Sequence, residues 1–571
     1  MKFFIKKIYF ISILILPIFW INISLAKATQ QYSKENISNY FSGIVALNQN
    51  NTADSFKYLN KAQSLKELHS NFNIKFIRSL VLLDKFDEAF AFSNKIWNED
   101  NNFFEVDLLL GLNSFIKEDY ITAEKHFKRL NNVYKNDLFF YQFLGNILIS
   151  WTKASQNNKK ESLTSFNKIP DRFNNLKLIQ NSFLQCYFEN EEAVDLYSKL
   201  INNEEGSFSR YNFFLVNYFL HKKQKKRSEI AINKASKNKN LTLLVRQTKL
   251  FLENNNERMA MSFFNCKNPK DAIAEIFYVI ANLYSSEKNY HQSNFYLKIS
   301  LLLNEKFITN KTLLAENYFL QEKYKVSEEV YQATKSIGEV YSWHASKSIA
   351  TILLKTNNKE TALSYLKKRF NSLKNKNFEH YYELANFYKD NKYYQESIKY
   401  YSLTLDKIKK NHFLISKILD RRGTSYEKIG KWSDAEKDLQ ESLKILPDQA
   451  YVLNYLAYSW IEKKINIKKS LKMLKQADDL KKNDPYITDS LGWAYFLNKN
   501  YDKAEKYLQR AVMLMPYDPV INDHYADTLW MLSKKIQARY FWNHAINLKN
   551  IEKELKDNIS NKLFFGISNQ L

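Results

Sequence analysis

The sequence predicts an all-α protein: an α-solenoid of about fourteen or fifteen helix–turn–helix repeats, closed by a C-terminal capping helix. Three observations predict this fold. Glycine and proline number only 9 and 7 in 571 residues, too few for a β protein rich in turns or for disordered linkers. Small and large side chains recur with a period of about 34 residues. The segment 551–565 then carries apolar side chains every fourth residue, as a helix that covers the end of a stack does.

The first 28 residues are predicted to be a secretory signal peptide. Lys2, Lys6 and Lys7 form a positive start, residues 8–23 are apolar, and the segment Ala26–Ala28 fits an A-x-A cleavage site. The apolar run is slightly long for a signal, so an uncleaved membrane anchor is the alternative. Membrane association is expected only in that case, because no later run of about 18 residues is apolar throughout.

The repeat signature is clearest near the C-terminus. If Gly492 is position 8 of a repeat, the small residues Ala504 and Ala511 fall at positions 20 and 27, and the large residues Tyr495 and Leu508 at positions 11 and 24. Only a small side chain fits where two helices approach closely, and the large residues fill the space beside them. Four other glycines are assigned to position 8: Gly43, Gly111, Gly145 and Gly423.

The spacing divides the chain into regions of different regularity. After the signal (1–28), residues 29–169 carry N-terminal repeats in which the pattern slips after Gly145. Residues 170–272 carry degenerate helical repeats, residues 273–549 a C-terminal array, and residues 550–571 the capping helix and tail. Prolines 485 and 519 are expected in the first turn of a helix, and prolines 447 and 516 at the ends of repeats.

This pattern closely resembles the tetratricopeptide repeat (TPR), a helix–turn–helix unit. The resemblance implies an α-solenoid that binds other proteins. The C-terminal repeats are similar to those of envelope-associated TPR proteins of proteobacteria, including outer-membrane lipoproteins. No cysteine lies near the predicted cleavage site, so lipid attachment is not expected there.

The two cysteines, Cys186 and Cys266, do not make a disulfide framework. In a linear array they lie in separate repeats and are not expected to reach each other. We interpret both as small buried apolar residues.

No motif of catalysis, metal binding or cofactor binding is present. The nine histidines are scattered, and GTSYEKIGKW (residues 423–432) has six residues between its glycines, where a phosphate-binding loop has four. The net charge of +25 comes from lysines spread along the whole chain, which favours the codon bias of an AT-rich genome over a nucleic-acid site. We therefore expect no enzyme activity, no cofactor, no metal and no nucleic-acid partner.

The resemblance places the partner-binding surface on the first helix of each pair. In the last repeats the corresponding side chains are aromatic and acidic, as peptide-binding surfaces often are. The candidate groove residues are Asn454, Tyr458, Asp489, Trp493, Phe496, Asp523, Asp527 and Trp530. The alternative is that the aromatics only pack between repeats and the acids only face water. Chaperone-binding members of the family have a basic, asparagine-rich groove, whereas an acidic groove suits a basic or extended neutral peptide.

The resulting hypothesis is a non-enzymatic scaffold or assembly factor of the bacterial periplasm or cell envelope, which binds protein partners in its concave groove. The alternative is an adaptor anchored in the inner membrane that serves envelope or polysaccharide-export machinery. The spacing itself indicates how the helices stack and does not identify a partner.

Overall fold

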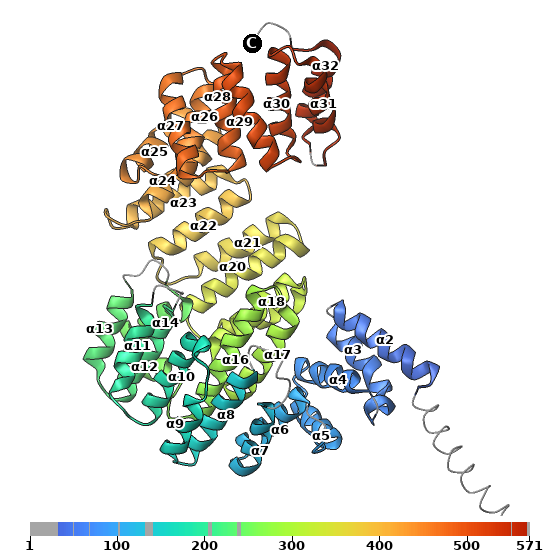
Figure 1. The fold of residues 1–571 in the computed structure, drawn as a ribbon. Coiled ribbons are helices and arrows are strands. Elements are labelled where there is room, and N and C mark those ends of the chain that lie inside the picture. The colour runs from blue at the N-terminus through green and yellow to red at the C-terminus, as the bar shows by residue number, and fades with distance from the viewer. Residues whose placement is uncertain are drawn as a thin grey trace, which may run out of the picture. The chain divides into compact units, whose positions relative to one another are not determined.

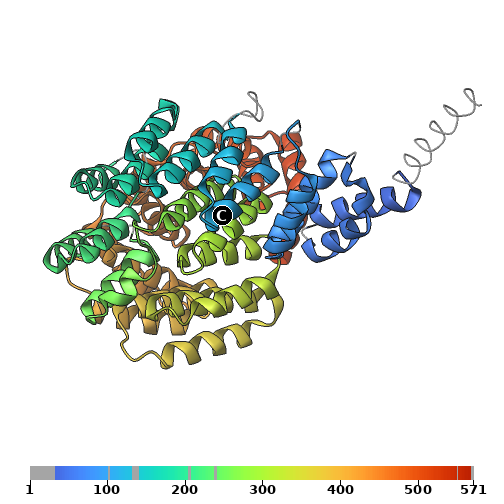
Figure 2. The same cartoon turned by 90° about the horizontal axis from the view of Figure 1, so that it is seen from below.

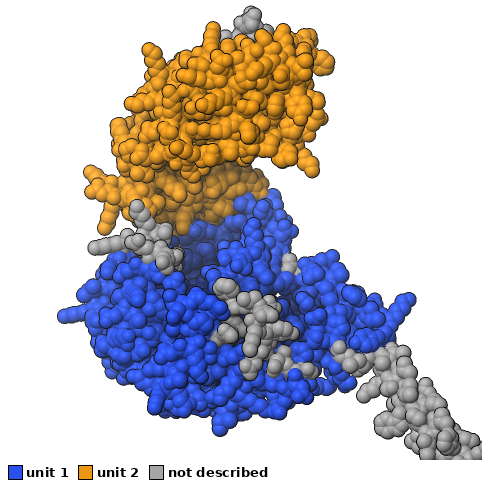
Figure 3. Space-filling view, in the orientation of Figure 1, with its two compact units in different colours: residues 1–358 blue, residues 359–571 orange. Residues whose placement is uncertain are grey.

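The computed structural model describes residues 32–49, 51–67, 69–100, 103–131, 141–203, 208–236, 241–549 and 551–567. These residues form helices and no strands, so the predicted all-α class is confirmed (Figures 1 and 2). The predicted signal peptide lies outside them. Helices α2 to α31 form fifteen successive pairs, and α32 follows. No helix in the described ranges is both long and apolar enough to span a bilayer. The chain divides into two compact units, residues 1–358 and 359–571 (Figure 3).

Unit 1 contains nine complete pairs and the first helix of the tenth. Its helices are α2 (Lys34–Asn48), α3 (Thr52–Lys61), η1 (Gln63–Glu67), α4 (Ser70–Leu82), α5 (Phe86–Ile96), α6 (Phe104–Ile116), α7 (Tyr120–Leu130), α8 (Tyr141–Ser155), α9 (Lys159–Asn167), η2 (Asp171–Phe173), α10 (Asn174–Tyr187), α11 (Glu192–Ile201), α12 (Tyr211–His221), α13 (Lys225–Ala235), α14 (Leu243–Glu253), α15 (Glu257–Met261), α16 (Pro269–Ser286), α17 (Tyr290–Leu303), α18 (Ile308–Leu320), α19 (Tyr324–Thr334) and α20 (Glu339–Thr356).

Unit 2 contains the more regular repeats. Its helices are α21 (Lys359–Asn371), α22 (Phe378–Asp390), α23 (Tyr394–Lys407), α24 (Ile415–Lys428), α25 (Trp432–Ile445), α26 (Ala450–Glu462), α27 (Ile467–Leu480), α28 (Pro485–Leu497), α29 (Tyr501–Leu514), α30 (Pro519–Met531), α31 (Lys535–Ile546) and α32 (Lys553–Phe565). Pro485 and Pro519 begin α28 and α30, where Asp484 and Asp518 cap the helices, as predicted.

Close approach within a pair explains the small residues. A Cβ on Gly492 would lie 2.6 Å from Leu508 Cγ, so glycine is required for α28 and α29 to pack. Gly145 was assigned to the same position, and this was wrong: it faces Asn131, at the end of the preceding helix α7. In that repeat Ser150 packs on its own partner helix instead, its Oγ 3.1 Å from Ser162 Oγ. Counted from Ser150 the spacing does not slip.

Nearly every described pair turns on one residue with positive φ, placed just after the first helix. In unit 2 this residue is Lys392, Gly430, Lys464, Lys499 or Ser533. Such a residue ends a helix by letting its N–H bond back to the last turn, a role in which glycine has no steric cost. Among the described turns glycine stands at this position only as Gly430, so this regular turn was hard to recognise from the sequence.

Unit 1 departs from a simple linear array. Helix α16 packs against α8 and α10, α17 packs against α4, and α14 packs against α20. Buried side chains from Tyr40 to Tyr341 therefore form one continuous hydrophobic core. Unit 2 has its own core, built mainly between consecutive helices.

The two cysteines also depart from the sequence-based expectation, which was wrong. Cys186 and Cys266 form a disulfide, with their Cα atoms 6.0 Å apart. The reason is that α15 has only five residues, and the segment after it folds back onto α10 and α12. Phe264 there packs against Phe183 and Phe214, with ring centroids 5.1 and 4.7 Å apart. Both cysteines are buried, as expected.

Candidate functional site

The candidate site lies in unit 2, on the first helices of the last three pairs. Helix α28 contacts both α26 and α30, so these three helices form one row. All eight predicted groove residues belong to this row. The structure thus brings them onto one side of the repeat array, although it buries several of them.

A pocket of about 550 Å³ opens where the carboxyl ends of these helices meet. Its lining comes from α26, α28 and α30, from the turns that follow the first two, from the first residues of α27 and α29, and from the C-terminal tail. The lining residues are Ile461, Glu462, Lys464, Ile467, Trp493, Phe496, Leu497, Lys499, Tyr501, Met531 and Ile567. Most of these side chains are apolar, and the charged ones are few, as in sites that bind an apolar group and orient it with polar contacts.

Trp493 is fixed in this pocket by three contacts. Its Nε1 donates a hydrogen bond to Glu462 Oε1 over 2.8 Å. Its ring stacks on Phe496 and on His524, with centroids 4.6 and 4.0 Å apart. An indole held in one orientation and only half-buried is a pre-organised contact surface.

The predicted acidic residues have partners within the chain. Asp489 accepts from His524 Nδ1 at 3.0 Å. Lys562 of α32 places its Nζ 2.9 Å from Asp523 Oδ2 and 2.7 Å from Asp527 Oδ2. All three carboxylates are buried, so they are not a free acidic surface.

Burial shapes the charge of this cluster. It raises the pKa of Asp527 to about 7, helped by the neighbouring Asp523 and opposed by Lys562. Burial opposes the charge of His524, but Asp489 outweighs it and raises the pKa of the imidazole. Trp542 Nε1 completes the cluster by donating to Asp527 Oδ1 over 2.9 Å.

The C-terminal segment supplies residues that the sequence-based search missed. The predicted capping helix is present as α32, and Ile559 on it is fully buried. After α32, Gly566 turns with φ 73° directly against the Trp530 ring, which leaves no room for a Cβ. Ile567 then reaches the pocket. The sequence signal that could have indicated this contact is Lys562 on the predicted capping helix, together with the two aspartates Asp523 and Asp527 in the last repeat.

The remaining predicted residues lie beside the pocket. Asn454 is half-buried, and its amide oxygen has no hydrogen-bond partner. Burial raises the pKa of the Tyr458 hydroxyl, and the nearby carboxylates of Glu462 and Asp489 add to this effect. Trp530 packs against Trp542, with ring centroids 5.4 Å apart. That these residues bind a partner stays a prediction.

A family profile described as tetratricopeptide repeat matches residues 488–518, which span most of α28 and α29. This segment of the chain therefore carries a tetratricopeptide repeat. A TPR repeat-containing protein of Pseudomonas aeruginosa is 30% identical over 99 residues, which are 17% of this chain and 17% of that protein. The matched part is thus a small share of the relative's length.

Several solved structures match about a third of the chain with low TM-scores. A thermophilic TPR protein of Thermus thermophilus is 16% identical with a TM-score of 0.29, covering 33% of this chain and 99% of its own. The C-terminal part of a TPR repeat-containing protein of Cytophaga hutchinsonii is 18% identical with a TM-score of 0.29, covering 38% and 94%. MamA of Desulfovibrio magneticus is 17% identical with a TM-score of 0.28, covering 31% and 97%.

Proposed function

We propose that the chain is a non-enzymatic scaffold that binds a partner protein through the pocket around Trp493. Tetratricopeptide-repeat proteins generally act as scaffolds for protein interactions. The observation that carries the proposal is the pocket of about 550 Å³ next to the row formed by α26, α28 and α30. Its volume falls within the usual range for sites that bury a small ligand or a few side chains.

The partner segment that fits best presents an apolar or aromatic side chain. Trp493, Leu497 and Met531 line the pocket, are only half-buried, and offer apolar surface for it. Lys464 and Lys499 stand among the lining residues and suit a backbone carbonyl or an acidic group beside that side chain. A basic partner, as the sequence suggested, would have to displace Lys562 from Asp523 and Asp527. An apolar anchor needs no such exchange.

We further propose that this scaffold acts in the periplasm or cell envelope of a bacterium. The predicted signal peptide at residues 1–28 supports export. The disulfide between Cys186 and Cys266 gives independent support, because such bonds persist in oxidising compartments. Mass spectrometry of the intact protein from fractionated cells tests this. A chain that starts at Thr29 and is recovered without detergent contradicts the anchored alternative. A retained N-terminus in the membrane fraction supports the anchor.

The experiment for the binding site is photo-crosslinking in living cells. A photoreactive amino acid replaces Leu497, which lines the pocket, and in a matched control it replaces Tyr517, which is exposed elsewhere on unit 2. A protein captured at position 497 and not at 517 supports the proposal. The captured segment is then titrated as a peptide, and Trp493→Ala is expected to weaken its binding by about 30-fold, as loss of a central aromatic does. Identical capture at both positions, or unchanged affinity, contradicts it.

A further inference from the structure

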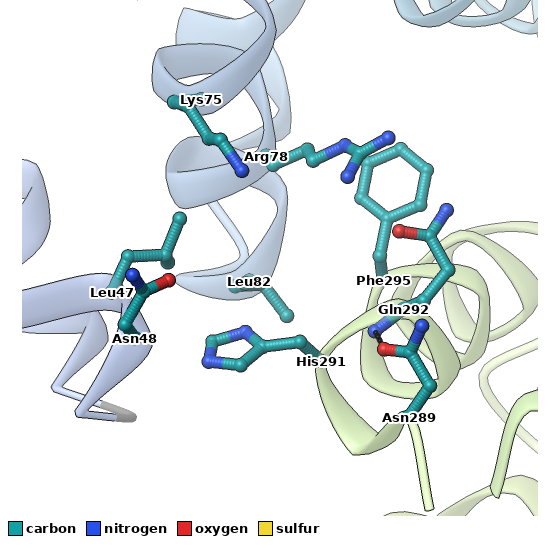
Figure 4. Close-up of a pocket in the computed structure, with 9 residues that line it drawn as sticks. All are labelled: Leu47, Asn48, Lys75, Arg78, Leu82, Asn289, His291, Gln292 and Phe295. Atoms are coloured by element: carbon teal, nitrogen blue, oxygen red, sulfur yellow. Dashed lines mark hydrogen bonds between the residues drawn. The ribbon is translucent and has the colours of Figure 1, made fainter. Parts of the chain in front are cut away.

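A second pocket lies wholly within unit 1, far along the sequence from the first. It has a volume of about 440 Å³ and is enclosed by residues from three helices (Figure 4). Leu47 and Asn48 come from the end of α2. Lys75, Arg78 and Leu82 come from α4. Asn289, His291, Gln292 and Phe295 come from the start of α17 and the residue before it. The pocket exists because α17 packs against α4.

The charged lining of this pocket has one sign. Lys75 and Arg78 face it from α4, and His291 faces it from α17 (Figure 4). No aspartate or glutamate is among the lining residues. The acid nearest to these cations is Glu105 of α6, which stands behind the pocket and accepts from Arg78 Nε at 2.9 Å. Arg78 is thus paired, whereas Lys75 forms no ion pair with a described carboxylate.

Lys75 carries an unpaired charge at a position that costs stability. Its side chain is half-buried, and no described carboxylate forms an ion pair with it. Burial lowers the pKa of Lys75, and the neighbouring Arg78 lowers it further. The charged form of a half-buried lysine is unfavourable when an arginine lies beside it and no carboxylate pairs with it.

His291 presents a second unsatisfied group. Its Nε2 is buried and has no hydrogen-bond partner among the residues that the structure describes. Burial lowers the pKa of the ring, Lys323, Lys75 and Arg78 add to this, and a hydrogen bond with the Leu47 carbonyl opposes it. Buried polar atoms in folded proteins are nearly always paired, so this nitrogen beside the charge of Lys75 points to a ligand-binding site.

The other polar groups favour a small polar ligand. Asn48, Asn289 and Gln292 place three amides around the cations. The first turn of α17, which Asn289 begins, adds the positive end of a helix dipole. Arg78 lies over the Phe295 ring, 5.9 Å from its centroid, which fixes the guanidinium at the rim of the site.

We propose that this pocket binds a small polar anion, whose phosphate or carboxylate group lies between Lys75, Arg78 and His291 and whose hydroxyls meet the three amides. The ligand supplies the negative charge that Lys75 lacks, and this charge favours protonation of the His291 ring, so that Nε2 donates a hydrogen bond to the ligand. This site is separate from the pocket around Trp493 and does not depend on the function proposed for it.

Calorimetric titration of the full chain in a phosphate-free buffer tests the proposal. The probes are inorganic phosphate, glucose 6-phosphate, glucuronate and, as the neutral control, glucose. We expect at least one anion to bind with a Kd below about 1 mM and glucose not to bind. Binding of phosphate and glucose 6-phosphate assigns a phosphate group, and binding of glucuronate alone assigns a carboxylate. If no anion binds below about 10 mM, the proposal is overturned.

Two variants locate the site. Lys75→Met and His291→Gln should each weaken anion binding by about 10-fold or more, because a charge-assisted hydrogen bond is lost. Lys234→Met, on the exposed face of α13, should leave binding unchanged. Lys75→Met should also raise the Tm of the anion-free protein, since it removes an unpaired buried charge. Undiminished anion binding in Lys75→Met would overturn the proposal, whatever the Tm.

Discussion

The two units use the same helix pairs and arrive at different kinds of packing. In unit 2 each helix packs mainly on its neighbours in sequence, and the spacing of Gly492 and Leu508 is repeated along the array. In unit 1 the spacing is degenerate over residues 170–272, and helices on either side of that stretch meet, as α4 and α17 do. Regular spacing in unit 2 thus gives an array of nearest neighbours, whereas unit 1 adds long-range contacts and, within its degenerate stretch, a disulfide.

The difference extends to the candidate sites. The pocket around Trp493 is formed by consecutive pairs and the tail that follows them. The pocket around Lys75 is formed by helices that only the closure of unit 1 brings together. Each unit also holds buried ion pairs, among them Arg210 with Glu275 in unit 1 and Lys562 with Asp527 in unit 2.

The largest effect is expected from Lys562→Met. It leaves Asp523 and Asp527 buried without a cation, which costs about 3–5 kcal/mol. In a nearest-neighbour array the loss should be confined to α30–α32, as measured by hydrogen exchange and mass spectrometry. The loss of stability should be smaller at pH 5, because Asp527 is protonated there and no longer needs a cation. Lys553→Met, exposed on the same helix, is the control. An equal loss of protection in α22–α24 would contradict the claim that unit 2 is an array of nearest neighbours.

The next effect concerns the disulfide. Replacing Cys186 and Cys266 together by serine should destabilise unit 1 by about 2–4 kcal/mol, because the unfolded chain regains the freedom of a long loop. Exchange should accelerate in α10–α16 and stay unchanged in α26–α30. A reducing agent should reproduce the effect in the wild type and add nothing in the variant. If reduction left hydrogen exchange of the wild type unchanged, the disulfide would not contribute to the stability of unit 1.

A smaller effect is expected from Gly492→Ala in the regular array. The new Cβ would meet Leu508 at 2.6 Å and its backbone nitrogen at 3.1 Å, so we expect a loss of about 1–3 kcal/mol from overpacking. Gly423→Ala is the matched variant, since its nearest contacts are at 3.1 Å and alanine favours the helix. Urea unfolding should rank Gly492→Ala below Gly423→Ala. The reverse order would contradict the packing argument.

The smallest effect is a pH dependence that belongs to unit 1. Burial raises the pKa of Glu275 to about 7, against the attraction of Arg210. The folded protein therefore holds this proton more tightly than the unfolded chain, and the resulting stability is lost as pH rises from about 4.5 through 7.

Between pH 6 and pH 8 this loss should be about 1 kcal/mol, measured by hydrogen exchange in α16. Glu275→Gln should remove this part of the pH dependence, and Glu229→Gln, exposed on α13, should retain it. An unchanged pH dependence in Glu275→Gln would contradict the assignment.

Several features were predictable from the sequence because they depend only on contacts between helices that are adjacent in the sequence. Gly492 with Leu508, the prolines at the starts of α28 and α30, and the capping helix are examples. Gly145 was misassigned because a glycine is equally suited to a close approach by the preceding helix, and Ser150 fulfils the same role less visibly. The burial of Asp523 and Asp527 could not be predicted, because it depends on the position that Lys562 takes when α32 packs on the last repeat.

The helix pair, its period and the helix that closes the array could be read from the sequence, because they follow from side-chain size at fixed short spacings. The long-range fold is needed to bring Cys186 to Cys266, Lys562 to its two aspartates, and Lys75 opposite His291. These contacts join residues tens to hundreds of positions apart. Their distances depend on the accumulated rotation of many pairs, which no local spacing records.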